Sequence, residues 1–252
     1  VLQPQDLGLL ASVGIDSVEV RTALRVAILN TGDEVVPPGQ PLLPGQLHDS
    51  NSFALRGLLQ KLGVQVVSVG IVADSLQETA EALRQAASTA DCIISTGGVS
   101  VGDEDHVRAA VEALGRLALW KLAIKPGKPF SFGEVCGKPF FGLPGNPVAV
   151  FVTFSLLVRP ALLRLMGAAT VQHPQFPVTL GFAVDSPGSR QEYLRVRLTH
   201  REGGATVLEA FTDQGSSLMS SLSWADGLAV IPPHTTFEQG EAVMFLPFTG
   251  LY

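Results

Sequence analysis

Two proline-stiffened turns of this sequence are well suited to bind an anion. The first, residues 142–147, reads Gly-Leu-Pro-Gly-Asn-Pro and lies between an apolar run and an apolar helical run. It predicts Asn146 as a helix N-cap and Pro147 as the first helical residue, where a missing N–H costs nothing. The second, residues 125–129, reads Lys-Pro-Gly-Lys-Pro and carries two ammonium groups. Free amides, the helix dipole and these lysines predict a phosphate or oxyanion site.

A glycine-rich segment and several carboxylates could complete this site. Residues 97–102 read Gly-Gly-Val-Ser-Val-Gly, which is typical of a phosphate loop but lacks a Walker lysine and the dinucleotide glycine spacing. Asp105 follows this segment, while Glu34 and Asp74 follow other predicted strands. One interpretation is that these carboxylates cap helices and turns; the other is that they hold Mg²⁺ against a bound phosphate. Carboxylates together with lysines favour a phosphate-bearing ligand plus a metal.

Alternating strands and helices must position these loops. Hydrophobic periodicity predicts strands over residues 26–29, 64–72, 91–95, 118–124, 129–132 and 138–142, and helices over residues 51–62, 75–87, 103–114 and 147–166. This alternation predicts a layered α/β domain that binds ligands at the carboxyl ends of its strands. Short runs beyond residue 176 predict a small all-β domain, a barrel or a sandwich. We expect a linker over residues 1–24, the α/β domain over 25–170 and the β domain over 175–252.

Composition narrows the class of protein. The chain has 252 residues, of which 46% are hydrophobic and 16% charged, and its net charge is −6. An acidic chain whose lysines are local does not favour nucleic acid or an anionic membrane as a partner. Cys92 and Cys136 lie far apart without metal-type spacing, which favours a reducing compartment, and the longest apolar run ends at Arg159. We therefore expect a cytoplasmic protein.

Five motifs follow one another along the chain. They are residues 31–34 (Thr-Gly-Asp-Glu), 49–51 (Asp-Ser-Asn), 97–103 (Gly-Gly-Val-Ser-Val-Gly-Asp), 125–129 and 142–147. In this order they resemble the molybdopterin molybdenumtransferases, the family of the bacterial MoeA proteins and the gephyrin E domain. The resemblance covers essentially the whole chain. It implies a three-layer α/β/α molybdopterin-binding domain, a C-terminal β domain, and an enzyme that uses Mg²⁺ to insert molybdenum from molybdate into adenylylated molybdopterin, releasing AMP.

The resemblance also assigns roles to residues. It implies catalytic roles for Glu34, Asp74, Asp105, Lys121 and Lys125, with Asp74 and Asp105 as metal ligands. The residues that it implies for binding of the pterin phosphate and the oxyanion are Thr31, Gly32, Asp33, Ser50, Asn51, Gly97, Gly98, Ser100, Gly102, Lys128, Pro144, Gly145, Asn146, Pro147, Arg190 and Ser216. It further implies a homodimer, and it makes molybdopterin adenylyltransferase a candidate partner.

The sequence departs from the family pattern at a few places. Ala149 stands where the family often has Ser, and Glu104 stands where an aromatic residue is common, so we expect altered molybdate affinity. The chain also begins without Met, and the N-terminal region with which the family completes the neighbouring subunit's site is absent from it. We therefore expect molybdopterin binding without efficient molybdenum insertion from this chain alone.

Three other functions fit parts of the sequence. An adenylyltransferase of the same pterin would share the α/β domain and its Gly-Gly loop, but it would not need residues 125–129 together with a β domain. A non-catalytic dimeric scaffold with a peptide groove would not need the carboxylates and lysines. A dinucleotide oxidoreductase is disfavoured because neither Gly32 nor Gly97 begins a Gly-x-Gly-x-x-Gly run.

Overall fold

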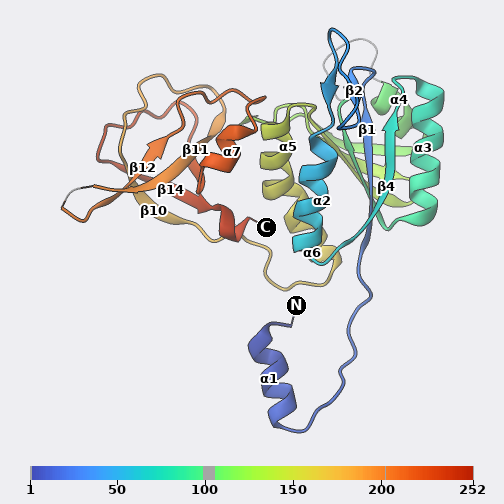
Figure 1. The fold of residues 1–252 in the computed structure, drawn as a ribbon, viewed down its shortest axis with the longest axis horizontal. Coiled ribbons are helices and arrows are strands. Elements are labelled where there is room, and N and C mark those ends of the chain that lie inside the picture. Colours follow the sequence, from blue (N-terminus) through green and yellow to red (C-terminus); the bar gives the residue numbers. More distant parts are fainter. Residues whose placement is uncertain (1, 99–105, 202, 252) are drawn as a thin grey trace.

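Two six-stranded sheets and a short two-stranded one organise the chain (Figure 1). The structure is a computed structural model and describes residues 2–98, 106–201 and 203–251. Its strands are β1 (Arg25–Thr31), β2 (Val35–Val36), β3 (Leu47–His48), β4 (Gln65–Val72), β5 (Cys92–Thr96), β6 (Gly115–Trp120), β7 (Ile124–Lys125), β8 (Ser131–Val135), β9 (Lys138–Leu143), β10 (Phe176–Leu180), β11 (Gln191–His200), β12 (Thr206–Ala210), β13 (Gly227–Ile231) and β14 (Ala242–Pro247). Its helices are α1 (Pro4–Ser12), α2 (Asn51–Lys61), α3 (Leu76–Thr89), α4 (His106–Leu114), α5 (Pro147–Thr153), α6 (Arg159–Leu165) and α7 (Ser220–Trp224), with a π-helix η1 (Phe154–Val158) and a 3₁₀-helix η2 (Phe248–Gly250).

The first sheet lies between two layers of helices. Its order is β4-β1-β5-β9-β8-β6, with β4, β1, β5 and β9 parallel and the last two strands antiparallel to their neighbours. Val26 and Ile28 of β1 join the core under α2, α5 and α6, whereas Ala27 and Leu29 join the core under α3 and α4. Because successive side chains of a strand point to opposite faces, both faces of β1 are covered. The three-layer α/β/α prediction is confirmed (Figure 1).

The second sheet closes on itself. Its order is β12-β10-β14-β13-β11-β7, and β12 also pairs with β11, so the strands from β10 to β14 form a barrel around Leu180, Val196 and Phe245. The predicted C-terminal β domain is confirmed, with α7 and η2 added to it.

One predicted strand of the α/β domain is divided between the two sheets. The sequence predicts a single strand over residues 118–124, but β6 ends at Trp120 and β7 pairs with β11 of the barrel. The backbone at Lys121 is left-handed, with a φ of 82°, which interrupts the extended chain. As a result, Lys125 lies on a strand that joins the barrel to the α/β domain.

A buried helical rod fills the space between the two domains. Residues Pro147–Leu165 have a mean hydropathy of 1.8, and by length and composition alone they could cross a membrane. In the fold, 56% of the most apolar window is buried, and its side chains share one core with Tyr193, Leu228 and Leu246 of the barrel. This helical segment is therefore buried to the extent expected of a core helix.

This rod is not the continuous α-helix that periodicity predicts. It is α5, η1 and α6 in succession, with a π-helical turn over Phe154–Val158. Pro160 cannot donate the hydrogen bond that an α-helix would send back to the carbonyl of Leu156, and the wider turn just before it accommodates that loss.

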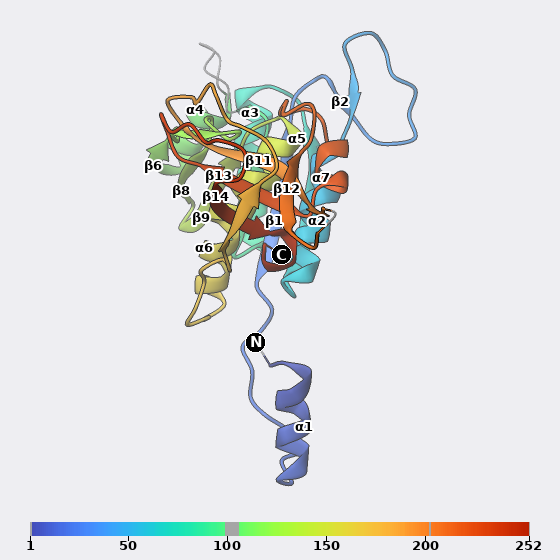
Figure 2. The same cartoon turned by 90° about the vertical axis from the view of Figure 1, so that its left-hand side faces the viewer.

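Most residues before β1 project from the body of the protein, although Leu2 and residues 20–23 line a cavity together with Leu62 and Leu163. Helix α1 lies in the stretch expected to be a linker, and none of its residues is buried. Figures 1 and 2 show it below the body, joined to β1 by an extended segment. In Figure 2 the loop between β2 and β3 projects at the opposite end, beside the strand ends of the first sheet.

Candidate functional site

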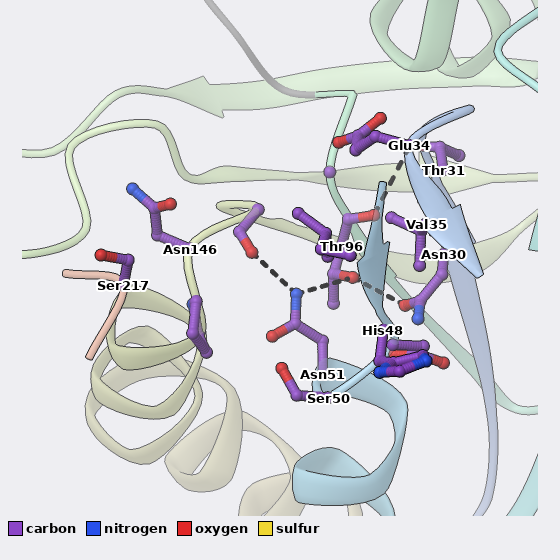
Figure 3. Close-up of a pocket in the computed structure, with 15 residues that line it drawn as sticks. Asn30, Thr31, Glu34, Val35, His48, Ser50, Asn51, Thr96, Asn146 and Ser217 are labelled. Atoms are coloured by element: carbon purple, nitrogen blue, oxygen red, sulfur yellow. Dashed lines mark hydrogen bonds between the residues drawn. The ribbon is translucent and has the colours of Figure 1, made fainter. Parts of the chain in front are cut away.

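A polar cavity of about 350 Å³ lies at the carboxyl ends of β1 and β5 (Figure 3). We call it the strand-end cavity. It is lined by Asn30, Thr31, Glu34, Val35, Leu47, His48, Asp49, Ser50, Asn51, Thr96, Gly97, Gly145, Asn146, Pro147 and Ser217. Glu34 and Asp49 are the carboxylates among these lining residues and no Lys or Arg is among them, so the cavity offers mainly hydrogen-bonding groups. This is the location that parallel-sheet architecture favours for a ligand.

A chain of hydrogen bonds fixes the floor of the strand-end cavity. The Thr96 hydroxyl donates to Asn30 Oδ1 at 2.6 Å, and Asn30 Nδ2 donates to Ser52 Oγ at 2.8 Å. All three side chains are buried, so each bond compensates for the loss of water. The chain ties the ends of β1 and β5 to the first turn of α2.

Asn51 connects this floor to the turn after β9. Its Nδ2 donates to the carbonyl of Gly145 at 2.8 Å and lies 3.5 Å from Thr96 Oγ1 (Figure 3). Helix α2 begins here because Asp49 Oδ1 accepts from the amide of Ser52 at 2.9 Å. The motif 49–51 therefore caps α2 through its aspartate and spans the cavity through its asparagine.

Two glycines allow the strand ends to approach each other. Gly97 has a φ of +79°, and a Cβ there would lie 2.3 Å from the carbonyl oxygen of Thr31. Gly98 has a φ of +63°, and a Cβ there would meet Val107 of α4 at 2.4 Å. Both the left-handed backbone and the close contact require glycine, because a side chain would push β1 and β5 apart.

A second cavity, of about 380 Å³, lies between the α/β domain and the barrel. We call it the cationic cavity. It is lined by Lys125, Pro126, Gly127, Lys128, Pro129, Pro144, Asn146, Ala149, Arg190, Gln214, Gly215 and Ser216. Three of these side chains are cations and none is a carboxylate, so the cavity attracts an anion.

The cations of this cavity are held by groups around it. Lys125 Nζ lies 3.2 Å from Glu192 Oε2, and Glu192 itself is only 15% exposed. Arg190 Nη1 donates to the carbonyl of Ile124 at 3.1 Å. Lys125 and Arg190 thus each use one polar contact for placement, and their remaining N–H groups are left for a ligand.

The two cavities meet at Asn146. Its Nδ2 donates to Ser216 Oγ at 2.8 Å, and it lines both cavities. Asn146 occupies the N-cap position of α5 as predicted, but its side chain makes no capping bond in the described structure. The amide N–H of Val148 instead donates to the carbonyl of Ser216 at 3.0 Å, and Pro147 has no amide N–H. The start of α5 therefore offers an anion fewer free amides than the sequence indicated.

Comparison with known proteins identifies the family. Residues 27–164 match the family described as probable molybdopterin binding domain, and residues 177–248 match the MoeA C-terminal region, domain IV.

The chain belongs to the MoeA family. The molybdopterin molybdenumtransferase of Haemophilus influenzae is 38% identical over 252 residues, covering 99% of this chain and 62% of that protein. That of a Nostoc species is 36% identical, covering 97% of this chain and 58% of that protein. A crystal structure of the molybdopterin biosynthesis MoeA protein from Pyrococcus horikoshii superposes with a TM-score of 0.82 at 33% identity, covering 98% of this chain and 60% of that one. The chain thus spans less than two thirds of the length of these MoeA relatives.

The structure brings together many of the residues that the MoeA resemblance implied. Thr31, Glu34, Ser50, Asn51, Gly97, Gly145, Asn146 and Pro147 line the strand-end cavity. Lys125, Lys128, Pro144, Asn146, Arg190 and Ser216 line the cationic cavity. Gly32 and Gly98 lie in the turns behind the strand-end cavity, and a Cβ at Gly32 would lie 2.6 Å from the Glu34 carboxylate. The roles of these residues stay predictions, but their placement is consistent with one composite site.

Among the described residues, most of the carboxylates that the resemblance implies, and Lys121, do not line either cavity. Asp33 and Asp74 meet beside the strand ends, where the Asp74 amide donates to Asp33 Oδ1 at 3.0 Å, and neither lines a described cavity. Lys121 is exposed, and its amide donates to the carbonyl of Phe130, outside both cavities. Asp105, Ser100 and Gly102 lie outside the described residues. Within the described part of the chain, no three His, Cys, Asp or Glu side chains are grouped so as to hold a metal ion.

Sequence reasoning missed several residues of the site. Asn30 and Thr96 carried a usable signal, because each is a polar residue at the end of a buried apolar strand. Gln214, Gly215 and Glu192 carried none, since they reach the cationic cavity or its lysine only through the packing of the barrel against the α/β domain.

Proposed function

We propose that the protein takes part in molybdenum cofactor biosynthesis by inserting molybdenum from molybdate into adenylylated molybdopterin, with release of AMP. The observation that carries the proposal is the junction at Asn146 of a polar cavity, rich in hydrogen-bonding groups, with a cationic one. Such a pair suits a large polar ligand next to a small anion. Membership of the MoeA family supports the same reaction, because relatives are named molybdopterin molybdenumtransferases.

We assign the pterin and its phosphate to the strand-end cavity, where the metal proposed below would offset the repulsion between that phosphate and the carboxylates of Glu34 and Asp49. Asn51, Thr31 and the turn at Gly97 offer hydrogen-bonding groups at the carboxyl ends of parallel strands, where such ligands bind. The rigid network of Asn30, Thr96 and Ser52 beneath them would keep these groups in place before the ligand arrives. A preorganised cavity loses little conformational freedom on binding, which favours affinity.

We assign molybdate to the cationic cavity. Lys125, Lys128 and Arg190 would neutralise the oxyanion, and the hydroxyl of Ser216 would donate to one of its oxygens. Because Asn146 lines both cavities, the oxyanion would lie next to the bound pterin. Holding two reactants side by side removes much of the entropic barrier to their reaction.

We propose Mg²⁺ as the metal of the reaction. Mg²⁺ commonly binds through one or two carboxylates together with water and substrate phosphates, so a three-residue cluster is not required. Asp74 and the predicted ligand Asp105 would supply the carboxylates, and Asp33 Oδ1 accepts a hydrogen bond from the backbone amide of Asp74. When bound, the metal would neutralise the adenylate phosphate and make AMP a better leaving group.

We further propose a cytoplasmic homodimer that receives its substrate from a molybdopterin adenylyltransferase. Both cysteines are free thiols, and Cys136 is exposed, which favours a reducing compartment. Burial raises the pKa of the Cys92 thiol to about 12, so this group is a packed apolar side chain and not a nucleophile.

Titration calorimetry of this chain with molybdate, adenylylated molybdopterin and a nicotinamide nucleotide tests the proposal. We expect the first two to bind and the third not to bind. Lys125→Ala should weaken molybdate binding by about tenfold or more, since charged hydrogen bonds contribute about 1.5–3 kcal/mol. Its melting temperature should fall to a lesser degree, because the Lys125 side chain is half exposed but Glu192, which is 15% exposed, loses its ion-pair partner.

Lys138→Ala is the matched control. Lys138 begins β9, at the opposite end of the strand from the cavities, so its removal should leave all titrations unchanged. Binding of the nicotinamide nucleotide in place of molybdopterin would contradict the proposal, and so would unchanged molybdate affinity in Lys125→Ala.

A further inference from the structure

A fully buried arginine lies directly behind the wall of the cationic cavity. Arg195 of β11 is 1% exposed and is the largest completely buried side chain described. It lines neither cavity. No salt bridge to it occurs within the described residues, and burial lowers the pKa of its guanidinium. The nearby negative charge of Asp213 offsets part of this effect, but a buried cation without a carboxylate in ion-pair contact still destabilises a core relative to an apolar side chain.

The guanidinium of Arg195 donates hydrogen bonds to both a loop and a helix. Its Nη2 donates to the carbonyls of Gly215 at 2.8 Å and Asp213 at 3.3 Å. Its Nε donates to the hydroxyl of Ser221 in α7 at 3.1 Å. Only a planar group with several donors in fixed directions can make these bonds together.

The backbone of Arg195 holds the same loop from a second side. The amide of Arg195 donates to Gln214 Oε1 at 2.9 Å, and Gln214 Nε2 donates to the carbonyl of Arg195 at 3.1 Å. Gln214 Nε2 also donates to the carbonyl of Phe211 at 3.0 Å. The segment from Phe211 to Gly215 is therefore attached to a single residue through both its side chain and its main chain.

This segment continues directly into the residues that separate the cavities. Gln214, Gly215 and Ser216 line the cationic cavity, and Ser217 lines the strand-end cavity. Ser216 also accepts from the amide of Val148 through its carbonyl and from the side chain of Asn146 through its hydroxyl. The position of this wall thus depends on Arg195 on the barrel side and on α5 on the other side.

We propose that Arg195 is a positioning residue that holds residues 213–217 as the common wall of the two cavities and thereby sets the affinity for the oxyanion. The inference rests on the proposed function for the identity of that anion. It explains why a charged side chain occupies a core position, because no apolar residue could hold two loop carbonyls and a helix hydroxyl at once. Arg195 does not touch the ligand; it acts through the Ser216 hydroxyl and the backbone around it.

The test compares Arg195→Lys and Arg195→Gln with Arg197→Gln in this chain. Arg197 lies on the same strand but is exposed, donating to the carbonyl of Trp224 and stacking 4.5 Å from its ring centroid. Molybdate affinity is measured by calorimetry, and the protection of individual amides by hydrogen exchange. Ser221→Ala, which removes one acceptor of Arg195 and lines neither cavity, is a milder variant in case the first two do not fold.

We expect both Arg195 variants to raise the Kd for molybdate by about tenfold or more, because lysine keeps the charge but not the planar set of donors. Ser221→Ala should raise it by about threefold, as expected for one hydrogen bond. The Val148 amide should exchange faster in all three variants while the amides of β13, which pairs with β11, keep their protection. Arg197→Gln should match the parent in both measurements.

Several results would overturn the inference. Parent-like molybdate affinity in Arg195→Lys would show that a point charge is enough. Loss of protection throughout β11 and β13 would show that Arg195 only stabilises the barrel. If the parent itself does not bind molybdate, the proposed function fails. The hydrogen-exchange rate of the Val148 amide then tests by itself whether Arg195 holds the wall.

Discussion

The strand-end and cationic cavities adjoin at one asparagine, yet they are built in different ways. The strand-end cavity takes most of its lining from the carboxyl ends of β1 and β5 and from the turns that follow strands of the same sheet. The cationic cavity combines a turn of the α/β domain with Arg190 and the loop around Ser216, both of which belong to the barrel. The strand-end cavity thus belongs mainly to the α/β domain, with Ser217 as its contribution from the β domain, whereas the cationic cavity exists only where the two domains meet.

This difference in construction indicates which kind of ligand each cavity suits. A sheet end supplies fixed backbone and neutral polar side chains, which suit a large ligand with many hydrogen-bonding groups. The domain boundary supplies cationic side chains, which suit a compact anion. The predictions below disturb one cavity at a time, from the largest expected effect to the smallest.

Gly97→Ala should cause the largest loss, in both stability and binding. The new Cβ would lie 2.3 Å from the carbonyl oxygen of Thr31, in a left-handed backbone, so the ends of β1 and β5 must separate. We expect the free energy of unfolding to fall by about 2 kcal/mol or more and molybdopterin binding to be lost. Chemical denaturation and titration of the folded variant measure the two effects.

Gly137→Ala is the control for backbone strain alone. Its φ is +77°, close to that of Gly97, but nothing lies within 4 Å of the added Cβ. It should cost about 1 kcal/mol and leave both ligands bound. Equal losses of stability in the two variants would mean that the close approach of the strand ends does not matter.

Arg190→Gln should have a smaller and more selective effect. The variant removes one of three cations from the cationic cavity, together with the bond to the carbonyl of Ile124. Molybdate affinity should fall by about tenfold, and the affinity for molybdopterin should stay unchanged. Titrations with each ligand at two salt concentrations check this, since the remaining molybdate binding should weaken further at high salt. A parallel loss of both affinities would show that the cavities act as one.

Asp91→Asn should have the smallest effect. Arg25 pairs with Asp91 at 2.9 Å near the amino ends of β1 and β5, the edge opposite the cavities. Hydrogen bonds from the side chain and backbone of Arg25 lower the pKa of the Asp91 carboxyl, so its contribution to stability is present above the unfolded pKa of about 3.9 and is lost as the pH falls through the folded value.

The expected result is a slightly lower melting temperature for Asp91→Asn at neutral pH and no difference from the parent in strong acid. Binding of both ligands should be unchanged. A stability difference that grows on acidification would contradict the assigned sign, and a change in ligand affinity would show that the two edges of the sheet are coupled.

The sequence predicted the sheet end better than the domain boundary, for a physical reason. The turns at residues 49–51 and 142–147 can be predicted from the sequence, because capping residues, prolines and glycines determine the conformation of their own backbone. Even there, the partner of the Val148 amide could not be foreseen, since Ser216 is distant in sequence. Arg195 looked like an ordinary strand residue, and only the folded barrel shows which carbonyls it holds.

The central claim is that two ligands bind in two adjoining cavities. Titration of Asn51→Ala and of Lys128→Ala with each of the two ligands tests it most directly. Asn51 lines only the strand-end cavity and Lys128 only the cationic cavity. We predict that Asn51→Ala weakens binding of adenylylated molybdopterin and leaves molybdate affinity unchanged, while Lys128→Ala does the reverse. If either variant lowers both affinities equally, or if each affects the other cavity's ligand, the assignment of the two cavities is contradicted.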